Sequence, residues 1–240
     1  LALETGAGRG DLLTDAAGDP KSAELAVDGG SAQLAIRSFG MPPSPRMAAL
    51  EILLVQALLV RLACEPCRLA LAPHGTLHDR WLLPYWLGRD LEVVLAELAD
   101  FGLAFEPGWF DAQAGWRTPL LGSVEIAGRR LELRAALEPW QLLATDADGR
   151  RAVDDSLDRL EVRVLGDLGA HEAVTCNGWA LPLAAAPDGG RVGGVRFRAR
   201  ALPRMLQPSL GITTPLTFDL VDTDLGRSRA GCRYHVNKPD

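Results

Sequence analysis

The chain has 240 residues, of which 48% are hydrophobic, so it can bury a substantial core in one large domain or two small ones. Acidic residues outnumber basic ones by 31 to 25, and the net charge of -6 argues against a nucleic-acid-binding protein. A chain with this much core does not need its four cysteines for a disulfide framework, which favours a reduced, cytoplasmic environment.

The ends of the chain carry no targeting signal. The chain begins at Leu1 and stops directly after strand-like residues, so both ends are expected to be cuts within a longer protein. The longest apolar stretch, Met47 to Ala63, contains Glu51, Gln56 and Arg61. A membrane span needs about 20 predominantly apolar residues, so this stretch predicts a buried helix and no membrane partner.

The first elements follow an irregular start of about thirty residues. Alternation over Leu34–Phe39 predicts a short strand, which a proline-rich run ends at Pro45. Because proline is tolerated in a first helical turn and Ser44 can cap it, a helix is predicted from Pro45 to about Cys64. This helix is apolar nearly all round, so we expect it to be buried between layers.

A second helix and a hairpin are predicted next. Apolar residues recur on one face from about Leu87 to Phe101, and Gly102 ends the pattern. Two strands over Val124–Arg134 flank Ala127–Arg129, a hairpin signal. This hairpin would place Leu131, Leu133 and Ala135 on one face.

After residue 150 the pattern changes to short alternating segments separated by turn residues such as Asn177-Gly178. The segments are Leu160–Leu165, Ala173–Cys176, Val195–Ala199 and Leu216–Val221. We therefore predict an α+β protein: residues 1–150 contain an antiparallel sheet with packed helices, and residues 151–240 form a small antiparallel β-sandwich-like domain.

Few residues offer chemistry by spacing alone. Cys64 and Cys67 have the spacing of a zinc or redox pair, but no second pair completes a tetrahedral site, so accidental spacing is favoured. The densest polar cluster lies between the two helices, where His78, Asp79 and Arg80 could share a site. They could equally cap a loop, with Arg80 paired to Asp79, and the sequence leaves both interpretations open.

Five blocks in chain order resemble the bacterial putative amidoligases, which are often fused behind a transglutaminase-like domain. The blocks are Leu34–Met47, Gly75–Pro84, Leu131–Trp140, Val174–Gly178 and Pro215–Val236. The resemblance implies a glutamine synthetase or glutamate–cysteine ligase type of fold that joins a carboxylate to an amine with ATP and Mg²⁺. It also implies upstream ligase and transglutaminase-like segments as partners in the parent chain, and a peptide or small-molecule carboxylate as substrate.

The matching blocks contain the candidate catalytic residues. They are Arg37, His78, Asp79, Arg80, Glu132, Arg134 and Glu138. Among them, Arg37 could instead form a structural ion pair, and Glu132 could be the polar side of a hairpin. No metal ligand is assigned, and the cofactor-binding residues stay open.

The chain also departs from the family pattern. The family usually has two glutamates where this chain has Ala35 and Gly40, and His is common where Tyr85 and Gln141 stand. Because Mg²⁺ prefers several oxygen ligands, these replacements weaken a metal site. Two hypotheses follow. The chain is either part of an ATP-dependent ligase that is incomplete or weakened here, or a non-catalytic scaffold or peptide-binding module derived from the family.

Overall fold

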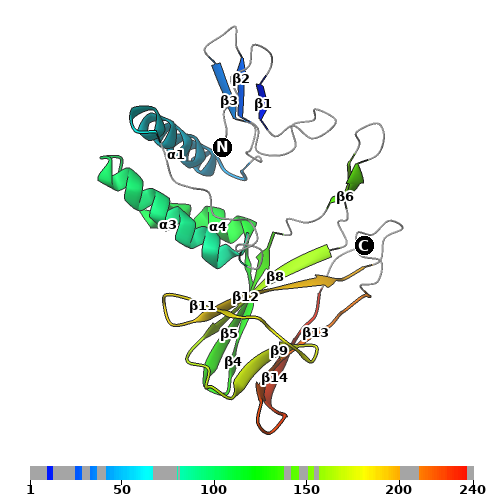
Figure 1. The fold of residues 1–240 in the computed structure, drawn as a ribbon. Coiled ribbons are helices and arrows are strands. Elements are labelled where there is room, and N and C mark those ends of the chain that lie inside the picture. Colours follow the sequence, from blue (N-terminus) through cyan, green and yellow to red (C-terminus); the bar gives the residue numbers. More distant parts are fainter. Residues whose placement is uncertain are drawn as a thin grey trace.

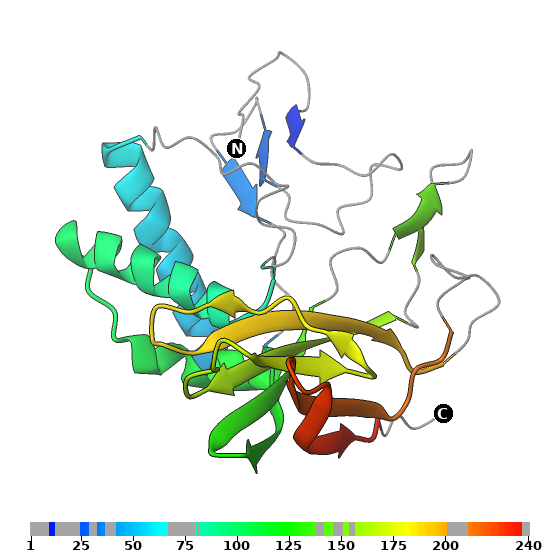
Figure 2. The ribbon, with the colours of Figure 1, turned by 60° about the horizontal axis from the view of Figure 1, so that its bottom comes forward.

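The computed structural model describes residues 10–12, 25–28, 33–36, 42–66, 80, 82–137, 142–145, 151–153, 157–200 and 211–236. Two antiparallel sheets stack on each other, and the helices gather at one side of them (Figures 1 and 2). This mixture of helices and separate antiparallel sheets confirms the predicted α+β class.

The helices within the described residues are α1 (Pro45–Cys64), α3 (Pro84–Asp100) and α4 (Asp111–Arg117), with the 3-10 turn η1 (Pro107–Phe110) directly before α4. The larger sheet has the order β11 (Ala184–Ala185), β12 (Arg191–Arg198), β8 (Leu157–Leu165), β5 (Arg129–Ala136), β4 (Leu120–Ile126). The smaller sheet has the order β10 (Trp179–Ala180), β9 (Glu172–Cys176), β13 (Leu216–Asp222), β14 (Arg227–Tyr234). Two further sheets consist of β1 (Gly10–Leu12), β2 (Leu25–Asp28) and β3 (Gln33–Ile36), and of β6 (Leu142–Thr145) and β7 (Arg151–Val153).

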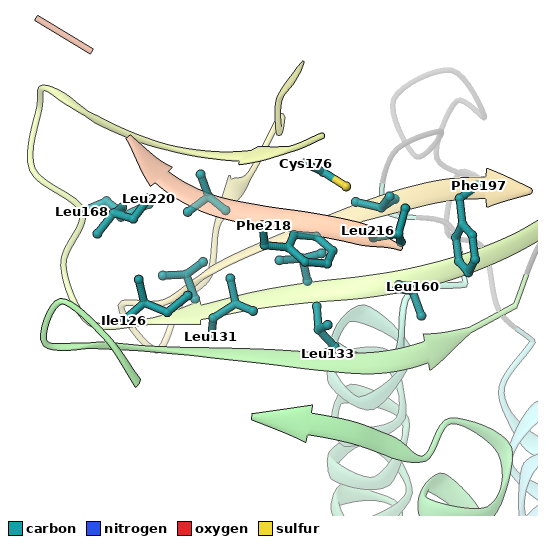
Figure 3. Close-up of a cluster of buried hydrophobic side chains, with 14 residues drawn as sticks. Ile126, Leu131, Leu133, Leu160, Leu168, Cys176, Phe197, Leu216, Phe218 and Leu220 are labelled. Carbon is teal, nitrogen blue, oxygen red and sulfur yellow. The ribbon is translucent and has the colours of Figure 1, made fainter. Parts of the chain in front are cut away.

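The main hydrophobic core lies between the larger and the smaller sheet (Figure 3). Because side chains alternate along a strand, Leu131 and Leu133 of β5 point to the same face, as predicted, and both are buried. Phe218 of β13 faces them from the smaller sheet, and its exposed fraction is 0%. One face of each sheet therefore packs into the core between the two sheets.

The predicted division of the chain at residue 150 runs through the larger sheet. Strands β5 and β8 pair from Arg130↔Leu165 to Ala136↔Arg159, so strands from both sides of that division share one sheet. Alternation shows which face of a strand is buried, but it does not show which strand lies beside it. The sequence pattern alone could not reveal this pairing.

The predicted helix cap and the two predicted tight turns are confirmed. The Ser44 side chain caps α1 and accepts a hydrogen bond from the Met47 N–H at 3.3 Å. Both predicted tight turns use positive φ, at Ala127 and Gly128 and at Asn177 and Gly178.

The prediction that α1 is buried between layers is wrong. In this helix only Met47 and Ala57 are buried, because α3 and η1 pack against one side of it and Gln113 of α4 bonds to Glu51. Apolar composition shows what a helix could bury, whereas the number of neighbouring elements decides what it does bury. By length and composition α1 could also cross a membrane, a test that the core helices of soluble proteins pass as well.

Candidate functional site

The face of the larger sheet that points away from the core carries alternating charges. Glu132 and Arg134 follow each other on this face of β5, and Glu161 and Arg163 do so on β8. The register places Glu132 beside Arg163 and Arg134 beside Glu161, so each acid has a base on the neighbouring strand. Such a face would normally be solvated.

Glu161 is instead almost fully buried, with an exposed fraction of 1%, because the first turn of α3 covers it. Leu83, the residue before α3, cannot cap the helix with its side chain, and Pro84 has no N–H. The backbone N–H of Tyr85 donates to Glu161 Oε2 at 2.7 Å, so a strand carboxylate caps the helix from a distance.

The environment of Glu161 changes its acidity. Burial raises the pKa of its carboxyl above the ordinary value. The Tyr85 N–H and the positive charges of Arg134 and Arg163 act in the opposite direction, while the charge of Glu132 adds to the increase. A buried carboxylate with a raised pKa is a frequent feature of functional sites, although helix capping alone also accounts for its position here.

A pocket of about 840 Å³ opens beside Glu161, where α3 and α4 meet the charged face of the sheet. A volume of this size suits a small-molecule ligand. Its lining is mixed in charge and consists of Pro84, Tyr85, Gly88, Arg89, Glu92, Asp111, Ala114, Gly115, Thr118, Arg134, Glu161, Arg163, Pro187 and Asp188.

The three arginines of this pocket differ in their partners. Arg89 pairs with Glu92, and Arg163 pairs with Asp188 while its guanidinium lies 5.0 Å from the centroid of the Tyr85 ring. Arg134 forms no hydrogen bond or salt bridge with any residue that the structure describes, and its charge acts on Glu161 only through space. Among the described pocket residues, Arg134 is therefore the arginine without an ionic partner.

The predicted catalytic residues fall into three groups. Arg134 lines the pocket. Glu132 is buried beside it but pairs with Arg130, at 3.2 Å between Nε and Oε1, and does not line the pocket. Arg80 is exposed, and its guanidinium lies 4.6 Å from the Trp86 ring centroid, outside the lining. The others, Arg37, His78, Asp79 and Glu138, lie outside the described residues.

Several pocket residues were not predicted. Glu161 and Arg163 lie within the predicted strand Leu160–Leu165, where their alternation indicates a polar, solvent-facing side. Asp188 was not predicted as a site residue, and α4, which contributes Asp111, was not predicted. The one available signal was that acidic and basic residues alternate along one face of β8. This alternation occurs both on a solvent-exposed face and on a face that lines a pocket, so it does not distinguish them.

A magnesium site needs several oxygen ligands close together. No three His, Cys, Asp or Glu side chains within the described ranges lie close enough together to hold a metal ion. Glu132 and Glu161 are on neighbouring strands, but Arg130 and the Tyr85 N–H already bind them. The described part of the chain therefore does not by itself supply a magnesium site.

The chain matches a family model described as "Putative amidoligase enzyme (DUF2126)" over residues 9–240. The match includes the sandwich, the helices and the pocket. No curated protein and no solved structure matches this chain. Since the family model spans nearly the whole sequence, the chain belongs to this putative amidoligase family.

Proposed function

We propose that the intact protein is an ATP-dependent ligase that joins a carboxylate to an amine, and that the pocket described here holds the carboxylate-bearing substrate. Family membership supports a ligase-like function in general. ATP, Mg²⁺ and a peptide or small-molecule substrate are part of the proposal. Upstream ligase and transglutaminase-like segments of the same parent chain would supply the metal ligands that the described residues lack.

The observation that carries this proposal is the Arg134 guanidinium, which is half-buried, lines the pocket and has no described anionic partner within salt-bridge distance. A guanidinium presents parallel N–H groups that match the two oxygens of a carboxylate. Partial burial strengthens such a pair, because water screens it less. Arg134 would thus fix the carboxylate, and the buried Glu161 beside it would hold the guanidinium in place through its charge.

Other residues of the pocket support an anionic ligand group. Arg163 Nε is buried, and no described residue accepts a hydrogen bond from it. The glycines at positions 88 and 115 face open space, so the pocket walls there are bare backbone. Negative charge that builds on an acyl group during activation would be stabilised by the same two guanidinium groups, of which that of Arg163 is held by Asp188.

Substrate binding is tested by titrating the chain with succinate, L-glutamate and a tripeptide while recording NMR chemical shifts. We expect one of these carboxylates to bind, and Arg134→Gln to weaken that binding at least about tenfold, which corresponds to about 1.4 kcal/mol. Arg130→Gln is the matched control, because Arg130 lies on the same face of β5, pairs with Glu132 and does not line the pocket. Equal affinities of the R134Q variant and the wild type, or no binding at all, would contradict the proposal.

The second candidate is a non-catalytic scaffold or peptide-binding module. It is favoured by Ala35, which lies in β3 opposite Ala26 and has no carboxylate where the family usually has one. Thermal unfolding of the intact parent with ATP separates the two candidates. Stabilisation that requires Mg²⁺ supports the ligase, and a parent protein unaffected by millimolar ATP with Mg²⁺ supports the module. For the 240-residue chain alone we expect no phosphate release from ATP.

A further inference from the structure

The charges that line the pocket beside Glu161 do not balance one another. Three arginines and four acids line it, so with all of them ionised the lining has a net charge of -1. A ligand that carries only negative charge would be repelled by this excess of acid. The pocket therefore suits a ligand that carries a positive charge as well as a carboxylate.

Asp111 is the acid of this lining that such a positive charge would meet. The other three acids each have a partner, which is an arginine for Glu92 and Asp188 and a backbone N–H for Glu161. The Asp111 side chain forms no hydrogen bond or salt bridge within the described part of the chain. Together with Arg134, the pocket thus presents one acid and one base that lack an ionic partner.

These two groups lie at opposite ends of α4. Asp111 is the first residue of the helix, and Thr118 follows its last residue. Arg134 lies at the Thr118 end, because it pairs with Leu120 at the start of β4. A helix rises about 1.5 Å per residue, so the distance along α4 from position 111 to position 118 is about 10 Å. We therefore expect the two charges of the ligand to be about this far apart.

The face of α4 between these two ends carries small side chains. Ala114 and Gly115 share this face with Asp111 and Thr118, since residues three, four and seven positions apart lie on one side of a helix. Outside its own stretch of helix, no described atom lies within 4 Å of the place that a Cβ of Gly115 would occupy, and the same holds for Gly88 of α3. Glycine weakens a helix interior, and packing within the described structure does not require it at either position. Both glycines therefore leave room for a ligand along α4.

We propose that the carboxylate-bearing substrate is a short linear peptide of about three residues with a free amino terminus. Its terminal carboxylate binds Arg134, its terminal ammonium binds Asp111, and its backbone lies along Ala114 and Gly115. An extended chain spans at most about 3.3–3.6 Å per residue, so three residues match the length of α4. A single α-amino acid is too short, because one Cα separates its two charges. This inference rests on the proposed function, which places a carboxylate at Arg134.

Isothermal titration calorimetry of the 240-residue chain tests the charge and the length of the ligand. The compounds are tri-L-alanine, N-acetyl-tri-L-alanine, L-alanine and succinate. We expect tri-L-alanine to bind, and we expect acetylation, which removes the ammonium charge, to weaken binding about fivefold, as the loss of an exposed ion pair does. L-alanine cannot reach both ends of α4, so it should bind at least about tenfold more weakly than the tripeptide.

Two variants test the residues that the proposal assigns. Asp111→Asn should weaken tri-L-alanine binding about fivefold and leave the affinity for the acetylated peptide unchanged, because that peptide has no ammonium. Glu106→Gln is the matched control, since Glu106 is an exposed acid at the start of η1 that does not line the pocket. Gly115→Ala should weaken tri-L-alanine binding about tenfold by narrowing the pocket. It should also raise the unfolding temperature, because alanine favours a helix, so misfolding would not explain the weaker binding.

The possible failures of this inference and of the proposed function differ. Equal affinities for the free and the acetylated peptide, or an unchanged affinity of the D111N variant for tri-L-alanine, overturn the inference. If Arg134→Gln still weakens binding of these compounds, the proposed function stands without it. Binding of succinate without binding of tri-L-alanine also overturns the inference alone. Binding of none of the four compounds overturns the inference and contradicts the proposed function as well.

Discussion

Replacing Phe218 by alanine is expected to lower the free energy of unfolding by about 3–5 kcal/mol. Phe218 has an exposed fraction of 0% and lies in the middle of the core between the two sheets (Figure 3). Strand β13, which carries it, pairs with β9 on one side and β14 on the other, so the backbone cannot move inward to fill the space. The loss therefore includes the cost of a cavity as well as the lost apolar burial.

Urea unfolding followed by circular dichroism measures this loss. Trp179→Ala is the matched aromatic control: Trp179 begins β10 of the same sheet but is 80% exposed, and we expect a change within about 0.5 kcal/mol. A loss below about 1 kcal/mol for Phe218→Ala would mean that the two sheets do not pack as described, since a buried aromatic side chain rarely leaves so small an effect.

The elements that the sequence predicted are those determined by neighbouring residues. Ser44 and Pro45 define the start of α1, and the Asn177-Gly178 pair defines a tight turn, because each acts within three or four residues of itself. Family membership was predictable for a related reason. Its signal lies in the order of several blocks, which the sequence contains in full.

The elements that the sequence did not predict depend on contacts between distant residues. The pairing of β5 with β8 and the exposure of α1 both depend on which elements become neighbours, which periodicity does not encode. Glu161 illustrates the point for the site. Its position on β8 is periodic, but its burial depends on Tyr85, which is 76 residues away in the chain.

Glu161→Ala is expected to lower the free energy of unfolding by about 2–4 kcal/mol. The substitution removes the acceptor of the Tyr85 N–H, so α3 loses its only described cap. It also leaves the neighbouring charge of Arg134 without the acid beside it in the sheet. Glu125→Ala is the control, because Glu125 lies on the exposed edge strand β4, and its loss should cost no more than about 0.5 kcal/mol.

The charge of Glu161 has a separate effect, which Glu161→Gln isolates because the amide keeps an oxygen acceptor for the Tyr85 N–H. Burial raises the pKa of Glu161 in the folded state, so between the unfolded and folded pKa values the folded state binds more protons. The stability contributed by this group therefore falls as pH rises from 4.5, its ordinary pKa, through the raised value. The free energy of unfolding of the wild type minus that of the E161Q variant should decrease over this interval and then level off. A difference that stays constant or increases with pH would mean that Arg134, Arg163 and the helix N-terminus outweigh burial, and that Glu161 is an ordinary ion-paired carboxylate.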